Sequence, residues 1–219
     1  MNLLLDLDGT LVDSSSGIYY SFAVACKSLE LTPPCYEEFR TKIGPPVDKI
    51  VAELYPSLDH SQICLFRNAF RNDYDHHSYR KAHWYPGVIS TIRLLTSLDH
   101  INMCIITNKP TIPSFNLVSE ACLDTSFAMI VGIDYMQIYA GGSLFANKAD
   151  AIEYVLCNQA FLPSETVYVG DTYSDKQASD RCHITFVAAL YGFYRWNISD
   201  TPIYLQQFSD ILSLCGTVG

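Results

Sequence analysis

Short apolar runs ended by turn-forming residues are the feature that most constrains the fold of this chain. None of them shows the polar alternation of a half-exposed strand, so they indicate strands buried on both faces, as in a parallel sheet. Segments with apolar residues three and four positions apart lie between them and predict helices, such as 88–98 and 148–161. Strands that alternate with helices predict a doubly wound α/β domain. The runs are the opening "LLLDL", "MCIIT" (103–107), "AMIVG" (128–132), "TVYVG" (166–170) and "TFVAAL" (185–190).

Residues 14–82 interrupt this rhythm. They contain helical patterns, "GIYYSFAVACKSLEL" and "HSQICLFRNAFRNDY", but no convincing strand. The segment "HWYPGV" (83–88) carries Pro86 and Gly87 and looks like the return to the α/β domain. We therefore expect an α/β core made of residues 1–13 and 83–219, with a helical insert over 14–82. Hinges that let the insert move relative to the core are expected near Val12–Ser16 and Ala82–Gly87, where the chain crosses between the two.

Composition narrows the classes of function. The formal charge of −9 argues against a general affinity for nucleic acid or for an anionic membrane, so an anionic substrate needs a local positive centre. The eight cysteines form no C-x-x-C pair, which predicts free thiols rather than zinc or disulfides. "MNLLL" lacks the features of a signal peptide, and no apolar stretch reaches membrane-spanning length. We expect a cytoplasmic protein, either a monomer or a homodimer.

Polar residues follow the predicted strands, where ligands bind in open α/β sheets. If the strands are neighbours, the four acids among these residues meet in one small volume. At a separation of about 4 Å and an effective dielectric near 20, each like-charged pair repels by about 4 kcal/mol. Such a cluster needs a cation, and all-oxygen ligands favour Mg²⁺. The residues are Asp6, Asp8, Thr107, Asn108, Asp171 and Asp175, with Lys148 opening the helix before the fourth strand.

Two acids on either side of Leu7 can divide the work of a group-transfer reaction. One carboxylate can attack a phosphoryl group and form an aspartyl phosphate, while the other handles the proton of the leaving group. Taken singly, Thr107 and Asn108 are equally typical of turn-forming residues at a strand end, and Lys148 is equally typical of a solvated residue in the first turn of a helix. Their order after Asp6 favours the functional interpretation.

Four segments together resemble the motifs of the haloacid dehalogenase superfamily of phosphohydrolases. "DLDGTLVDS" looks like the nucleophile motif, "IITNKP" like the second, Lys148 like the third and "VGDTYSD" like the acidic fourth. Within the superfamily, "TNKP" and "IGPPVDKI" are similar to phosphoglycolate phosphatases. The resemblance implies a Rossmann-like core, a helical cap over 14–82, a Mg²⁺ cofactor and a small phosphate ester as substrate.

The resemblance also implies roles for single residues. Asp6 is then the nucleophile, and Asp8 is the general acid and base, whose backbone carbonyl also binds the metal. Asp171 completes the metal site, and Asp175 either binds the metal through water or orients Lys148. Thr107 and Asn108 are expected to hydrogen-bond the phosphoryl group, and Lys148 to neutralise its charge.

Substrate choice is expected to come from the insert, where Gly44, Pro45 and Pro46 predict a rigid turn between helices. In this loop Lys42 is the best candidate to bind a substrate carboxylate, and ordinary solvated charge is its alternative. We expect 2-phosphoglycolate, with pyrophosphate, nucleotides and sugar phosphates as alternatives. A phosphomutase is also possible within the superfamily, although 17–19 lacks the expected histidine. A non-catalytic phosphate-binding module is disfavoured because every catalytic position is filled.

Overall fold

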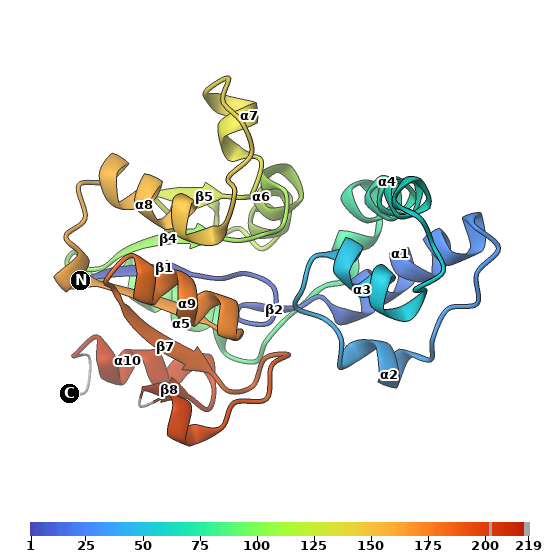
Figure 1. Ribbon diagram of the computed structural model, residues 1–219. Coiled ribbons are helices and arrows are strands. Elements are labelled where there is room, and N and C mark those ends of the chain that lie inside the picture. Colours follow the sequence, from blue (N-terminus) through green and yellow to red (C-terminus); the bar gives the residue numbers. More distant parts are fainter. Residues whose placement is uncertain (202, 217–219) are drawn as a thin grey trace. The chain divides into compact units, whose positions relative to one another are not determined.

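The computed structural model describes residues 1–201 and 203–216, and the chain divides into two compact units (Figure 1). The first unit contains Met1–Asp13 and Trp84–Gly219, and the second contains Ser14–His83. The second unit is thus inserted into the first, between Asp13 and Trp84. The predicted architecture, a parallel α/β core with an inserted helical segment, is confirmed.

A six-stranded sheet forms the centre of the first unit. Its strand order is β5-β4-β1-β6-β7-β8, and every neighbouring pair is parallel. Strand β1 lies between β4 and β6, so the carboxyl ends of these three strands are adjacent. That edge of the sheet is where the predicted site residues follow the strands. The strands are β1 (Asn2–Leu5), β4 (Asn102–Ile106), β5 (Met129–Val131), β6 (Thr166–Gly170), β7 (Thr185–Ala189) and β8 (Tyr204–Leu205).

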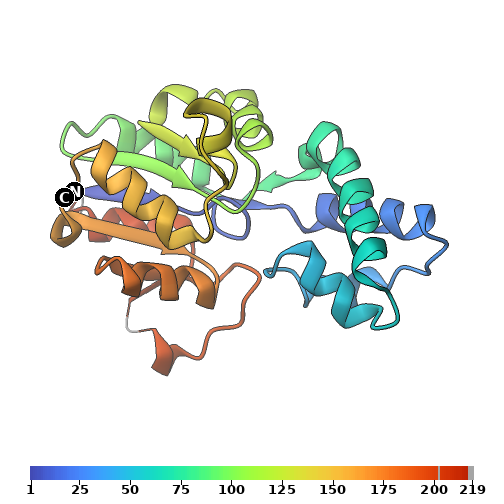
Figure 2. The ribbon, with the colours of Figure 1, turned by 45° about the horizontal axis from the view of Figure 1, so that its top comes forward.

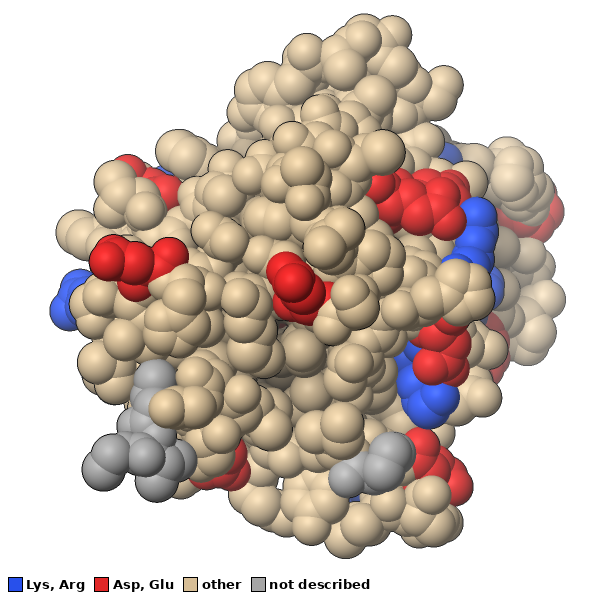
Figure 3. Space-filling model, turned by 90° about the vertical axis from the view of Figure 1, so that its left-hand side faces the viewer, with Lys and Arg blue, Asp and Glu red and all other residues tan. Residues whose placement is uncertain are grey.

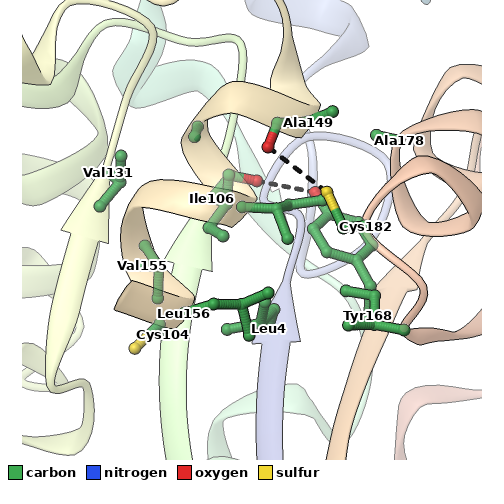
Figure 4. Close-up of a cluster of buried hydrophobic side chains, with 13 residues drawn as sticks. Leu4, Cys104, Ile106, Val131, Ala149, Val155, Leu156, Tyr168, Ala178 and Cys182 are labelled. Atoms are coloured by element: carbon green, nitrogen blue, oxygen red, sulfur yellow. Dashed lines mark hydrogen bonds between the residues drawn. The ribbon is translucent and has the colours of Figure 1, made fainter. Parts of the chain in front are cut away.

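Helices cover both faces of this sheet, with α8 and α9 on the near side in Figure 1 and α5 behind. Figure 4 shows the core under α8, where Leu4 and its register partners Cys104 and Tyr168 are buried. The hydroxyl of Tyr168 donates to the carbonyl of Ile106 at 2.9 Å, which satisfies the polar atom of a fully buried ring. The helices are α5 (Val88–Thr96), α6 (Thr111–Glu120), α7 (Tyr135–Tyr139), α8 (Lys148–Asn158), α9 (Tyr173–Arg181) and α10 (Ile211–Leu214). The described part of the unit also contains short 3₁₀ helices, which are η2 (Asp124–Ser126), η3 (Pro163–Glu165), η4 (Ile198–Asp200) and η5 (Phe208–Asp210).

The second unit is helical and has an aromatic centre of its own. The ring of Phe22 lies 4.5 Å from that of Phe39 and 4.8 Å from that of Phe66, measured between centroids. These three rings come from three different helices, so they hold the unit together. The elements are α1 (Ser15–Ser28), α2 (Tyr36–Arg40), α3 (Val47–Leu54), α4 (His60–His76) and η1 (Ser78–Lys81), and Figure 2 gives a second view of them.

The chain leaves and re-enters the first unit through two short strands, β2 (Val12–Asp13) and β3 (His83–Trp84), which pair with each other. The five predicted strands are all present, and none of their ends differs from the prediction by more than two residues. The sequence did not indicate β2, β3 or β8, because each has only two residues.

All eight cysteines lie within the described residues and are free, as predicted. Among the described helices, none has both the length and the apolar character needed to cross a membrane.

Figure 3 shows the charged side chains on the face of the molecule where β1 begins. Asp and Glu side chains are scattered over this face, whereas Lys and Arg side chains lie in small groups at its margins.

Candidate active site

Asp6 is fixed at the point where β1 ends. Its backbone N–H donates to the carbonyl of Val169 at 2.9 Å, which continues the pairing with β6, and its Oδ1 accepts the N–H of Leu7 at 2.8 Å. The side chain is buried, with the residue only 5% exposed. The chain then turns back, because the N–H groups of Leu11 and Val12 both donate to the carbonyl of Leu7.

Gly9 makes this turn possible for two reasons. Its φ of +83° lies in the left-handed region that side chains disfavour. A Cβ atom at Gly9 would also lie 2.2 Å from Oδ2 of Asp171, closer than atoms can approach. The glycine after the two acids therefore lets the loop pass directly over Asp171.

Three carboxylates meet at this edge of the sheet. Asp6, Asp171 and Asp175 are all buried, and each offers an oxygen within 4.8 Å of the others. Asp171 follows β6, and Asp175 lies in the first turn of α9. The sequence predicts four acids in one small volume, and three of them, Asp6, Asp171 and Asp175, lie together in the structure.

Lys148 is the cation that the structure places in this cluster. It opens α8, and its Nζ lies 2.9 Å from Oδ2 of Asp6 and 2.5 Å from Oδ1 of Asp175. Burial alone would lower the pKa of Lys148, but the two carboxylates, Asp175 foremost, outweigh burial and raise it well above its ordinary value. Lys148 therefore stays charged.

One lysine does not balance three buried acids. Burial raises the pKa of Asp6 to about 7 even though Lys148 acts to lower it, and Asp175 adds to the rise. Burial, then Asp175 and Asp6, likewise raise the pKa of Asp171 well above its ordinary value. The site thus carries an excess of negative charge that a cation would relieve.

Asp171 shows where a cation fits. Its Oδ2 accepts the N–H of Phe193 at 2.7 Å, and its backbone carbonyl accepts Nε1–H of Trp196 at 2.8 Å. Its Oδ1 is buried and has no hydrogen-bond partner among the described residues. A buried carboxylate oxygen without a donor is costly, and a divalent cation is the group that its chemistry suits.

Asp175 uses both carboxylate oxygens within the protein. Oδ2 accepts the N–H and the hydroxyl of Thr172, at 2.9 Å and 2.6 Å, which caps α9. Oδ1 accepts from Lys148. This contact is the one expected if Asp175 orients Lys148.

The side chain of Asp8 is not part of the cluster formed by Asp6, Asp171 and Asp175. Its side chain is 22% exposed, and its Oδ1 lies 2.8 Å from Nζ of Lys109, which is 1% exposed. Sequence reasoning missed Lys109. The signal was there, since Lys109 directly follows Thr107 and Asn108 in the loop after β4, the strand that neighbours β1.

The other predicted site residues are Thr107 and Asn108, in the first unit, and Lys42, in the second unit. Thr107 is buried, and its hydroxyl accepts the N–H of Lys109 at 3.2 Å, while Asn108 is exposed at the same strand end. Lys42 belongs to the second unit, where its Nζ pairs with Oε1 of Glu53 at 2.5 Å. The donors to Asp171, Phe193 and Trp196, were not predicted either, because they come from a loop more than twenty residues downstream.

Comparison with models of known protein families identifies the family of this chain. The model of the haloacid dehalogenase-like hydrolases matches residues 3–189, most of the chain. The chain belongs to the haloacid dehalogenase-like hydrolase family. The resemblance seen in the four motifs is thereby confirmed, and the chain is a phosphatase of this family.

Two similar relatives are both called phosphoglycolate phosphatase. The protein from Pseudomonas syringae pv. tomato is 31% identical over 200 residues, which covers 87% of this chain and 70% of the relative. The protein from Photobacterium profundum is 26% identical over 226 residues and covers 97% of this chain and 94% of the relative.

Solved structures share the fold. A haloacid dehalogenase-like hydrolase from Streptococcus pneumoniae matches with a TM-score of 0.83 at 24% identity, covering 98% of this chain and 97% of the other. A predicted phosphatase from Clostridium acetobutylicum matches with a TM-score of 0.84 at 20% identity, over 99% of this chain and 98% of the other. At these identities the matches establish the haloacid dehalogenase-like architecture.

Proposed function

We propose that this phosphatase hydrolyses small phosphate monoesters through an aspartyl phosphate formed on Asp6, with Mg²⁺ as cofactor. The observation that carries the proposal is the buried set of Asp6, Lys148 and Asp171, in which Oδ1 of Asp171 has no partner among the described residues. Asp6, Asp171 and the backbone carbonyl of Asp8 would hold the metal. When bound, Mg²⁺ supplies positive charge against the phosphoryl oxygens.

The first half of the reaction transfers the phosphoryl group. A carboxylate oxygen of Asp6 attacks phosphorus, and the bond from phosphorus to the ester oxygen breaks with its electron pair going to that oxygen. The carboxyl of Asp8 gives the leaving oxygen a proton, so an alcohol departs. Thr107 and Asn108 hydrogen-bond the phosphoryl oxygens, and Lys148 offsets the charge of Asp6 and of the transferring group.

The second half releases phosphate. Asp8, now a carboxylate, takes a proton from water as the water oxygen bonds to phosphorus. The bond between phosphorus and Asp6 breaks, and its electron pair restores the Asp6 carboxylate. One Asp8 side chain thus serves both halves, as acid and then as base.

We assign residues 14–82 as the cap that selects the leaving group, and residues 1–13 and 83–219 as the catalytic core. The preferred substrate that we propose is 2-phosphoglycolate, supported by the names of the two relatives and by the "TNKP" segment. Lys42 is the proposed partner of the substrate carboxylate, which would replace Glu53 at its ammonium group. The free cysteines support a cytoplasmic location.

A substrate panel tests the proposal directly. Purified protein is assayed for phosphate release from 2-phosphoglycolate, a sugar phosphate, a nucleoside monophosphate and pyrophosphate, each with Mg²⁺ and with a chelator. We expect the highest kcat/KM for 2-phosphoglycolate and no turnover after chelation. A low rank for 2-phosphoglycolate would reject the substrate, and turnover that survives chelation would reject the cofactor.

A further inference from the structure

The ion pair between Lys109 and Asp8 links two loops that are far apart in the sequence. Lys109 follows β4 and Asp8 follows β1, and Nζ of Lys109 lies 2.8 Å from Oδ1 of Asp8. The lysine side chain is 1% exposed, whereas the Asp8 side chain is 22% exposed. A buried ammonium group needs a partner of opposite charge, so this contact is part of how the loop is built.

The backbone of Lys109 is fixed on both sides. Its N–H donates to the hydroxyl of Thr107 at 3.2 Å, and its carbonyl accepts the N–H of Ile133 at 3.3 Å. Gly132 lies so close that a Cβ atom there would be 2.5 Å from the Lys109 carbonyl. With its backbone held and its side chain buried, Lys109 presents its ammonium group to Asp8 from one defined direction.

This contact distinguishes the two oxygens of Asp8. An ammonium group has three donors and no acceptor, so the oxygen that faces it serves as an acceptor and does not carry a proton. That oxygen is Oδ1. The other oxygen, Oδ2, is left to bear the proton when Asp8 is a carboxylic acid.

We propose that Lys109 is a positioning residue that holds Oδ1 of Asp8 in both halves of the reaction, so that Oδ2 donates and receives the transferred proton. The inference rests on the proposed function, in which Asp8 is the acid and base. In the first half the proton moves from Oδ2 to the ester oxygen as the bond from that oxygen to phosphorus breaks. In the second half a water proton moves to Oδ2 as the water oxygen bonds to phosphorus.

The effect of the leaving group on activity distinguishes a residue that positions Asp8 from a residue that only stabilises the fold. An alkoxide leaves poorly without a proton, whereas nitrophenolate leaves readily without one. Because kcat/KM reports the steps up to the first irreversible one, it is insensitive to later hydrolysis of the aspartyl phosphate. A residue that positions Asp8 should therefore matter for an alkyl phosphate much more than for p-nitrophenyl phosphate.

The test is a double-mutant cycle on the full chain with Mg²⁺. Lys109→Met, Asp8→Asn and the double variant are compared with the wild type, using glycerol 1-phosphate, 2-phosphoglycolate and p-nitrophenyl phosphate. We expect Lys109→Met to lower kcat/KM by roughly 10- to 100-fold for both alkyl esters and by less than about 5-fold for p-nitrophenyl phosphate. In the Asp8→Asn background the same substitution should cause no further loss.

Lys109→Arg is the matched control, because it keeps a donor group and should recover most of the alkyl ester activity. It also keeps the test decisive if Lys109→Met unfolds, which thermal melts without metal would show. Equal losses on all three substrates, or losses that multiply with those of Asp8→Asn, would overturn the positioning role. A loss confined to 2-phosphoglycolate would overturn it too, because Lys109 would then bind the substrate carboxylate. A wild type that hydrolyses none of these esters would reject the proposed function and this inference with it.

Discussion

Replacing Asp171 by Asn should stabilise the metal-free protein while removing its response to Mg²⁺. Asp171, Asp6 and Asp175 share a buried volume in which their oxygens lie within 4.8 Å of one another. At that separation and an effective dielectric near 20, a fully ionised pair repels by about 3.5 kcal/mol. The amide keeps an oxygen to accept the N–H of Phe193 and removes one negative charge.

The net gain is smaller than one full pair, because two features of the site already reduce the repulsion. Lys148 lies between Asp6 and Asp175, and the pKa of Asp6 is raised by burial to about 7, so Asp6 is partly protonated near neutral pH. We expect Asp171→Asn to raise the free energy of unfolding by about 1 to 3 kcal/mol at pH 8. For a chain of this length each kcal/mol corresponds to a Tm shift of about 2 to 4 °C.

The pH dependence has a definite sign. Burial raises the pKa of Asp171 in the folded protein, so between the ordinary pKa of an aspartate and the raised value the folded state binds more protons than the unfolded state. The stability of the metal-free wild type therefore falls as the pH rises through that range. The variant lacks this loss, so its advantage should grow from pH 5 to pH 8.

Calorimetric melts with a chelator and with Mg²⁺ measure both effects. Mg²⁺ at about 100 times its dissociation constant should stabilise the wild type by about 2.7 kcal/mol and leave Asp171→Asn unchanged. Asp180→Asn is the matched control, because the Asp180 side chain is exposed, lies outside the acidic cluster and pairs with Lys176. A variant that melts below the wild type in chelator, or that gains as much from Mg²⁺, would refute the placement of the cation at Asp171.

Three further outcomes are expected from single substitutions. Asp6→Asn should abolish turnover while the far-ultraviolet circular dichroism spectrum stays that of the wild type, and a near-normal kcat would remove Asp6 from the nucleophile role. Asp8→Asn should lower the kcat for 2-phosphoglycolate by about 10²- to 10⁴-fold, since proton transfer is the step it loses, and steady-state rates that hardly change would argue against an acid and base at this position. Lys42→Ala should raise KM for 2-phosphoglycolate more than for glycerol 1-phosphate, because only the former offers a carboxylate, and equal effects would dismiss that role.

The predictable part of the fold is the part with strong local signals. Strands β4 and β6 are buried on both faces, so they read as unbroken apolar runs, and the polar residues after them mark the edge where ligands bind. Strand β8 has only two residues, of which Tyr204 is exposed, so no run marks it. Asp6 and Asp171 could be found because each directly follows such a run.

Contacts that depend on tertiary structure could not be predicted. The bond from Phe193 to Asp171 and the pair of Lys109 with Asp8 join residues 22 and 101 positions apart, and no local pattern encodes either one. The charge on Lys109 was visible in "TNKP", but its burial against Asp8 follows from the adjacency of β4 and β1.

Chemical trapping of the intermediate tests the central claim most directly. Wild type and Asp8→Asn are mixed with Mg²⁺ and p-nitrophenyl phosphate, whose leaving group needs no proton from Asp8, then quenched and reduced with borohydride, which converts an aspartyl phosphate into homoserine. Peptide mass spectrometry should find homoserine at position 6 only after exposure to substrate, and more of it in Asp8→Asn, where hydrolysis of the intermediate is slowed. Turnover with unmodified Asp6 in both proteins, or homoserine at a different aspartate, would contradict the mechanism.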